Sequence, residues 1–124
     1  MQDLLALSAV EARAALDAKD VSSVELTSAY IQAAEDTAAL NNYVLLAADK
    51  ALDMASDADK RIADGESGVL EGLPIGVKDM FCTKGVTSTA CSKILDGFTP
   101  NSTLNPPLEI ISSASLKDSF IVLS

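Results

Sequence analysis

The run Gly72–Asp79, Gly-Leu-Pro-Ile-Gly-Val-Lys-Asp, constrains the fold of this chain more than any other feature. Apolar runs of this length beside glycine are typical of buried strands in parallel sheets, so the sequence predicts a strand over residues 73–79. A lysine at the end of such a strand is costly to bury unless its amine is paired, neutral or used in chemistry. The chain contains no histidine. Lys78 is therefore the first candidate for a general base, and the carboxylates come second.

Two capping boxes of the form S-x-x-E mark the starts of helices. One joins Ser8 with Glu11, and the other joins Ser22 with Glu25. With the apolar spacing that follows each of them, and a third amphipathic segment, the sequence predicts helices over residues 9–18, 24–39 and 47–63.

The third predicted helix has an apolar stripe made of Ala48, Leu52, Ala55, Ala58 and Ile62. Asp59 falls on the same side and interrupts the pattern, and Gly65 follows at a position where helices commonly end. Between the second and third helices, Tyr43–Leu46 is expected to be a short strand or an extended segment. The order helix, helix, strand, helix, strand predicts an α/β protein rather than an all-α one.

The net charge of −9 is concentrated in the predicted helices. Residues 1–66 carry 13 acidic and 5 basic side chains, whereas residues 67–103 carry 3 of each. An acidic surface repels phosphate, so little direct binding of nucleic acid is expected. The first five residues do not resemble a signal peptide, and no run approaches the roughly 20 apolar residues of a membrane span. We therefore expect a cytoplasmic protein with no membrane contact.

The two cysteines, Cys82 and Cys91, have eight residues between them. Without a histidine or a CxxC motif, they offer too few ligands for a structural zinc site. We expect both to be small core residues rather than reactive thiols, in a reducing compartment.

Residues 3–103 resemble the N-terminal part of amidase-signature enzymes. Three pieces carry the resemblance: Leu7-Ser8-Ala9-Val10-Glu11 with Val21-Ser22-Ser23-Val24-Glu25-Leu26; Leu73-Pro74-Ile75-Gly76-Val77-Lys78-Asp79; and Phe81-Cys82-Thr83-Lys84-Gly85-Val86 with Ser92-Lys93-Ile94-Leu95. The second piece is typical of amidases broadly, and the third is similar to the glutamine-hydrolysing subunits of tRNA-dependent amidotransferases. The resemblance implies helices packed on a mixed sheet, of which this chain would hold a truncated, N-terminal part.

The resemblance also implies a reaction, amide hydrolysis by two serines and a lysine. Lys78 would be the base and would act through a bridging serine, which activates a second, nucleophilic serine. Burial can lower the pKa of a lysine by several units from about 10.4, and a neutral amine can then accept a proton from serine. The substrate would be glutamine. The released ammonia would pass to a partner subunit that converts Glu-tRNA(Gln) to Gln-tRNA(Gln); the resemblance leaves open whether glutamate- or aspartate-charged tRNA is the one served.

Partners and cofactors follow from the same resemblance. The other subunits of a heterotrimeric amidotransferase would bind this chain. ATP and Mg²⁺ would belong to the partner subunit that holds the tRNA, so no cofactor or metal site is expected in this chain.

The sequence departs from the family pattern after Lys78, because the glycine- and serine-rich signature that carries both serines is missing. Eight serines follow the lysine, and none lies in a Gly-Gly-Ser-Ser-Gly-like loop: Ser88, Ser92, Ser102, Ser112, Ser113, Ser115, Ser119 and Ser124. We assign no catalytic role to Ser88 or Ser92. Met80 stands where the family usually has asparagine.

Residues 104–124 do not continue the family pattern and resemble a shifted reading frame or a fused extension. Within them, Ser119–Leu123 is typical of an exposed strand. The expected organisation is a partial amidase-signature domain over residues 1–103 followed by this divergent tail. Truncation leaves strand edges and apolar faces uncovered, so weak folding cooperativity is expected. We expect the chain to be inactive alone; the alternatives are a non-catalytic interaction fragment and an unstable truncation product.

Overall fold

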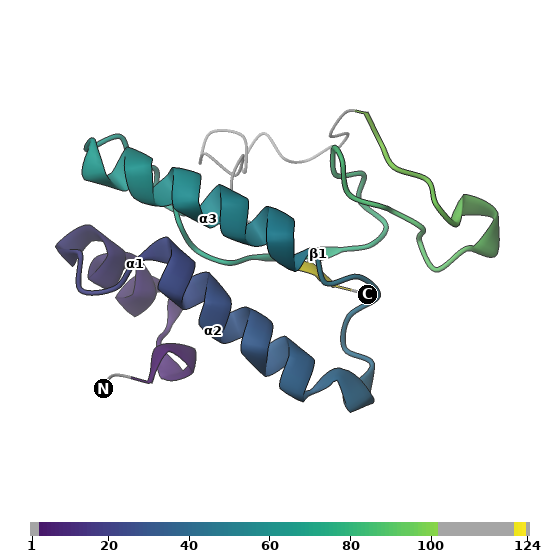
Figure 1. Cartoon of the computed structure of the whole chain (residues 1–124), viewed down its shortest axis with the longest axis horizontal. Coiled ribbons are helices and arrows are strands. Elements are labelled where there is room, and N and C mark those ends of the chain that lie inside the picture. Colours follow the sequence, from purple (N-terminus) through teal and green to yellow (C-terminus); the bar gives the residue numbers. More distant parts are fainter. Residues whose placement is uncertain (1–2, 102–120, 124) are drawn as a thin grey trace.

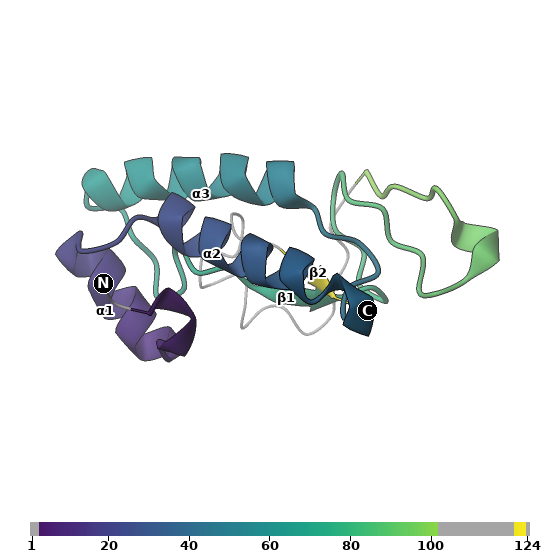
Figure 2. The same ribbon diagram turned by 60° about the horizontal axis from the view of Figure 1, so that its bottom comes forward.

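Three α-helices and a small parallel sheet make up most of the regular structure in the described part of the chain. The computed structural model describes residues 3–101 and 121–123. The elements are α1 (Ala9–Ala18), α2 (Ser23–Asp36), α3 (Ala48–Ala63), β1 (Gly76–Lys78) and β2 (Ile121–Leu123), with short 3₁₀ helices at Leu4–Ala6, Ala38–Leu40 and Lys93–Leu95. Helices α2 and α3 run antiparallel, side by side, and residues 80–101 project beyond the start of α3 (Figures 1 and 2).

Both predicted capping boxes are present and explain where α1 and α2 begin. The Ser8 hydroxyl accepts a hydrogen bond from the Glu11 backbone N–H at 3.3 Å, and the Ser8 backbone N–H donates to the Glu11 carboxylate at 2.8 Å. The corresponding distances for Ser22 and Glu25 are 3.1 and 2.9 Å. Hydrogen bonds from Ser8 hold the pKa of the exposed Glu11 carboxyl below its usual value. The starts of these helices are therefore encoded locally.

The ends of two helices are less regular than their starts. Helix α1 ends as predicted at Ala18, and Lys19 then takes a left-handed conformation with φ of 61°. Helix α2 ends at Asp36, three residues before the predicted end, and a 3₁₀ helix follows at Ala38–Leu40. The Ala33 carbonyl, in the last turn of α2, accepts both the Thr37 backbone N–H at 3.2 Å and the Thr37 hydroxyl at 2.7 Å.

The hydrophobic core lies among α1, α2 and the segment that leads to β1. Its buried members are Ala12, Leu16, Val21, Leu26 and Leu73. Where α2 and α3 pack together, α3 buries Ala51, Ala55 and Ala58, whose small side chains allow the two helices to approach closely. The core is thus built from aliphatic residues, as a chain with 4% aromatic residues requires.

Asp59, which interrupted the apolar stripe of the third predicted helix, has a specific structural role. Its two carboxylate oxygens accept hydrogen bonds from the backbone N–H groups of Ser23 at 2.6 Å and Val24 at 3.2 Å. These are the first two residues of α2, whose N–H groups have no partner within the helix. An aspartate on α3 therefore completes the N-terminal cap of α2.

The sheet differs from the prediction in length and burial. The expected strand over residues 73–79 is shorter in the structure, where β1 spans Gly76–Lys78. Leu73 and Asp79 are buried but lie outside the strand. β1 pairs in parallel with β2, with Val77 opposite Val122 and Lys78 opposite Leu123. The expected strand within Ser119–Leu123 is therefore present at 121–123, whereas the rest of the predicted tail, 104–120 and Ser124, lies outside the described residues. Residues 43–46 form no strand.

In the part of the chain that the structure describes, no helix has the length and apolar character needed to cross a membrane.

Candidate active site around Lys78

Lys78 is the last residue of β1, and its side chain is exposed. Val77 is half-buried and Gly76 is exposed. The expectation that Lys78 ends a buried strand is therefore wrong for the described residues. The physical reason is that β1 has only β2 beside it among those residues, and a two-stranded sheet cannot cover both of its faces.

Asp79, the next residue, has the opposite environment and is 4% exposed. One carboxylate oxygen accepts the Thr89 backbone N–H at 3.0 Å; the other accepts the Thr89 hydroxyl at 2.7 Å and the Cys91 N–H at 3.3 Å. The Asp79 carbonyl also accepts the Ala90 N–H at 3.3 Å. Burial alone would raise the pKa of Asp79, but the hydrogen bonds from Thr89 and from the backbone outweigh burial and hold this pKa below its ordinary value.

The segment that Asp79 contacts is conformationally unusual. Ala90 and Cys91 are consecutive residues with φ of 48° and 55°, in the left-handed region that costs a non-glycine residue about 1–2 kcal/mol. Cys91 is exposed and Cys82 is half-buried. The prediction that both cysteines are core residues is therefore wrong: the turn that Asp79 holds carries the Cys91 side chain to the surface, and Cys82 lies outside the buried core.

A stability change with pH should follow from the environment of Asp79. A carboxyl with a lowered pKa in the folded state stabilises the fold above its unfolded pKa, about 3.9, and loses this contribution as the pH falls through the folded value. We expect the wild-type midpoint of urea unfolding to fall as the pH is lowered below about 4. Asp79→Asn should show a smaller fall, because it has no charge to neutralise; an identical pH profile would contradict this role of the carboxylate.

The loop after β1 is held at several further points. The Lys50 amine, on α3, donates to the Lys84 carbonyl at 2.5 Å. Backbone N–H groups of Gly85 and Ser88 donate to the carbonyls of Pro100 at 2.9 Å and Phe98 at 3.0 Å. These contacts fold residues 83–100 back on themselves beside β1.

The two serines of this loop have structural hydrogen bonds. The Ser88 hydroxyl lies 3.3 Å from the carbonyls of Phe81 and Val86, and Ser88 is buried. The Ser92 hydroxyl accepts the Ile94 N–H at 3.3 Å and caps the 3₁₀ helix at Lys93–Leu95. Both hydroxyls are thus hydrogen-bonded to the backbone of the loop.

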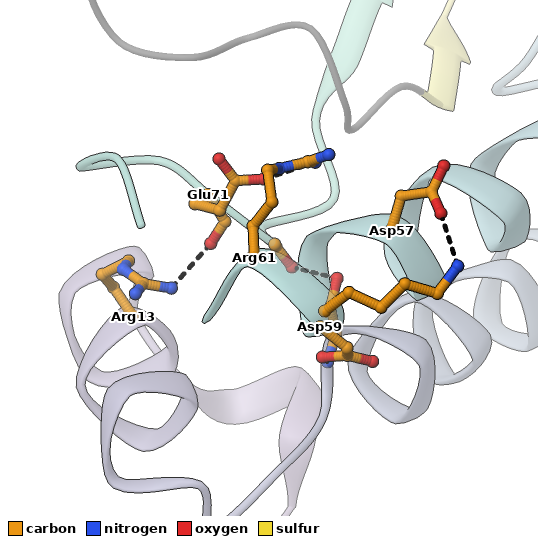
Figure 3. Close-up of polar contacts among 8 residues, drawn as sticks. Arg13, Asp57, Asp59, Arg61 and Glu71 are labelled. Carbon is orange, nitrogen blue, oxygen red and sulfur yellow. Dashed lines mark hydrogen bonds and ion pairs between the residues drawn. The ribbon is translucent and has the colours of Figure 1, made fainter. Parts of the chain in front are cut away.

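A buried polar cluster before β1 fixes the segment that leads to Lys78 (Figure 3). The Arg61 guanidinium donates twice to one oxygen of the Glu71 carboxylate, at 2.7 and 3.1 Å, and the Glu71 side chain is 1% exposed. Arg13, on α1, donates to the Glu71 carbonyl at 2.7 Å, and the Ser23 hydroxyl of α2 donates to the Gly72 carbonyl at 2.8 Å. All three helices therefore contact residues 71–72.

Sequence reasoning missed this cluster. The available signal was weak: Glu71 is the only charged residue between Glu66 and Lys78, within an otherwise apolar and glycine-containing stretch. Charged residues are almost never fully buried unless they are paired, but the sequence does not show that this one is buried.

A separate apolar groove of about 180 Å³ lies between α1, α2 and residues 70–75. Leu7, Leu26, Tyr30 and Leu73 are among the residues that line it. Tyr30 is the one lining residue with a polar side-chain group, and no lysine or carboxylate lines the groove. Among the described residues, no three His, Cys, Asp or Glu side chains gather to hold a metal ion.

Comparison with known proteins identifies the family. A family model described as Amidase matches residues 25–104, more than half of the chain. The chain therefore belongs to the amidase-signature family. Over 100 residues it is 55% identical to the A subunit of the glutamyl-tRNA(Gln) amidotransferase of Parvibaculum lavamentivorans and 56% identical to that of Azorhizobium caulinodans. Each match covers 81% of this chain and 20% of the relative, so the chain spans about one fifth of their length.

Solved structures confirm the fold class. A fatty acid amide hydrolase superposes with a TM-score of 0.75 at 24% identity, over 97% of this chain and 21% of that one. A vestigial protein complex related to the origin of an s-triazine catabolic enzyme superposes with a TM-score of 0.77 at 23% identity, over 94% of this chain and 25% of that one. The described helices and sheet thus form part of an amidase-signature fold.

Proposed function

We propose that this chain is the first part of a glutamine-hydrolysing amidotransferase subunit, in which Lys78 is the general base for amide hydrolysis. The observation that carries the proposal is the high identity to the amidotransferase subunits. A match over 81% of the chain necessarily includes Lys78, Asp79 and the loop that Asp79 holds. By the same proposal, the ammonia released from glutamine passes to the other amidotransferase subunits, which contain the ATP and tRNA sites.

The exposure of Lys78 defines what the remainder of the enzyme has to supply. A lysine acts as a base near neutral pH only when burial or a nearby positive charge disfavours its protonated form. Lys78 is exposed in this chain, so neither its strand nor its loop provides that burial. The rest of the subunit would cover the amine and contribute the bridging and nucleophilic serines. The chain alone is accordingly proposed to be inactive.

Complementation tests the proposal. The chain would be co-expressed with the part of the Parvibaculum lavamentivorans relative that lies outside the matched region, together with the other subunits of that amidotransferase. We expect ammonia release from glutamine only when both pieces are present. Lys78→Ala should lower the rate by about 10²-fold or more, because general-base catalysis contributes at least that much.

Lys93→Ala is the matched control, because Lys93 is another exposed lysine of the same region and starts the 3₁₀ helix Lys93–Leu95. It should leave the rate unchanged. Full activity of Lys78→Ala in a complex that still co-purifies would overturn the assignment of the base.

A non-catalytic interaction fragment is the second candidate, and the apolar surface of the loop after β1 favours it. Met80 is 59% exposed, Ile94 93% and Phe98 46%. Exposed apolar side chains grouped in one segment are typical of surfaces that another protein covers. The same co-expression distinguishes the two functions: co-purification of the chain without ammonia release would favour the interaction fragment.

A further inference from the structure

We infer that Asp79 is a positioning residue for Lys78: its buried carboxylate ties the end of β1 to the Thr89–Cys91 turn and so fixes the direction in which Lys78 projects. This inference rests on the proposed function only in taking Lys78 as the base. It assigns Asp79 no contact with substrate.

The first step is the direct connection between the two residues. Lys78 ends β1 and is exposed, and Asp79, the next residue, begins the turn that follows the strand and is 4% exposed. Because one planar peptide unit joins them, holding Asp79 in place restricts the backbone of Lys78 and with it the direction of the Lys78 side chain. The Phe81 N–H, which donates to the Lys78 carbonyl at 3.0 Å, closes a turn immediately after the strand.

The second step is the strength of the hydrogen bonds between Asp79 and the Thr89–Cys91 turn. Three donors reach the Asp79 carboxylate, and all belong to Thr89 or Cys91, ten and twelve residues further along the chain. Hydrogen bonds to a charged acceptor are roughly twice as strong as neutral ones. β1 is only three residues long, so these bonds are a large part of what holds its end.

The third step is the strain of the turn. Ala90 and Cys91 keep left-handed conformations without being glycine. Strained residues of this kind persist only where the surrounding structure over-determines them, and they cluster at functional sites. The Cys91 N–H and the Ala90 N–H both donate to Asp79, through its carboxylate and its carbonyl respectively. Asp79 therefore stabilises the strained turn and the strand end together.

Thr89→Val tests this inference at a distance from Lys78. The change removes the hydroxyl that donates to Asp79 at 2.7 Å and keeps the shape of the side chain. Amide hydrogen exchange of Phe81 and Ala90, whose N–H groups donate to the Lys78 and Asp79 carbonyls, is measured by NMR in the intact chain. We expect exchange at both amides to become about tenfold faster, because a hydrogen bond to a charged group is lost. Exchange within α2 and α3 should not change.

Two variants serve as controls. Thr87→Val removes a hydroxyl of the same loop that lies 3.4 Å from the Thr99 hydroxyl, and it should leave both amides unchanged. Thr89→Ser keeps the hydroxyl and should restore slow exchange. If Thr89→Val makes amide exchange faster throughout all three helices, the Asp79→Asn variant is measured instead. The same increase in exchange is expected at its Phe81 amide.

The complemented enzyme provides a second readout. Thr89→Val should lower kcat for glutamine with little change in KM, and Thr89→Ser should recover it. The exchange measurement needs no activity, so failure of complementation affects only the proposed function. Unchanged Phe81 exchange in Thr89→Val, or an equal change in Thr87→Val, would overturn the positioning role.

Discussion

Arg61→Ala is expected to lower the free energy of unfolding by about 3–5 kcal/mol. Its guanidinium makes two hydrogen bonds to one oxygen of a Glu71 carboxylate that is 1% exposed, so truncation leaves a buried negative charge without this partner. Folded domains are stable by only about 5–15 kcal/mol, so the variant should be close to unfolding at room temperature. Urea denaturation followed by far-ultraviolet circular dichroism measures the change.

The neighbouring residue provides the matched control. Lys60 pairs with Asp57 at 2.8 Å, but both side chains are largely exposed, at 70% and 59%. Solvent screens such a pair, so Lys60→Ala should have almost no effect. A double-mutant cycle adds Glu71→Gln. In this background, Arg61→Ala should lower the free energy of unfolding much less than it does in the wild type. Equal costs in the two backgrounds would show that the ion pair is not the source of the effect.

Gly72→Ala is expected to cost about 2–4 kcal/mol, for two separable reasons. Gly72 has φ of 76°, where a side chain is strained, and a Cβ there would lie 3.1 Å from the Ile62 Cδ1 and 3.2 Å from the Ser23 Cβ and Oγ. The added methyl group would push against the hydroxyl that donates to the Gly72 carbonyl. The same urea titration measures the loss.

Gly65→Ala separates strain from crowding. Gly65 has a nearly identical φ of 79°, but nothing lies within 4 Å of a Cβ built there. It should therefore cost only the conformational part, about 1–2 kcal/mol. If both substitutions cost the same, close packing of Gly72 against Ser23 and Ile62 does not contribute to stability.

The helices could be predicted from the sequence because their signals are local. Each capping box places both partners within four residues, and both boxes are present with the predicted hydrogen bonds. The early end of α2 was not predictable in the same way, since Ala38 and Ala39 are compatible with either an α-helix or the 3₁₀ helix that forms.

Long-range contacts explain what the sequence did not reveal. Asp59 interrupted an apolar stripe, and only the packing of α3 against α2 shows that it caps Ser23 and Val24. The burial of Glu71 depends on Arg61, and the exposure of Lys78 depends on how many strands lie beside β1. The motif around Lys78 identified the family from residue types, but residue types do not determine how much of a side chain is covered.

The cap that Asp59 provides has a consequence for biosynthesis. During translation, Ser23 and Val24 leave the ribosome long before the aspartate that accepts their N–H groups. A nascent chain that stops short of residue 59 has to leave these two amides to water, so its second helix frays at the start. The start of α2 is therefore held by the Ser22–Glu25 capping box alone until α3 has been made, and the packing of α3 against α2 then completes the cap.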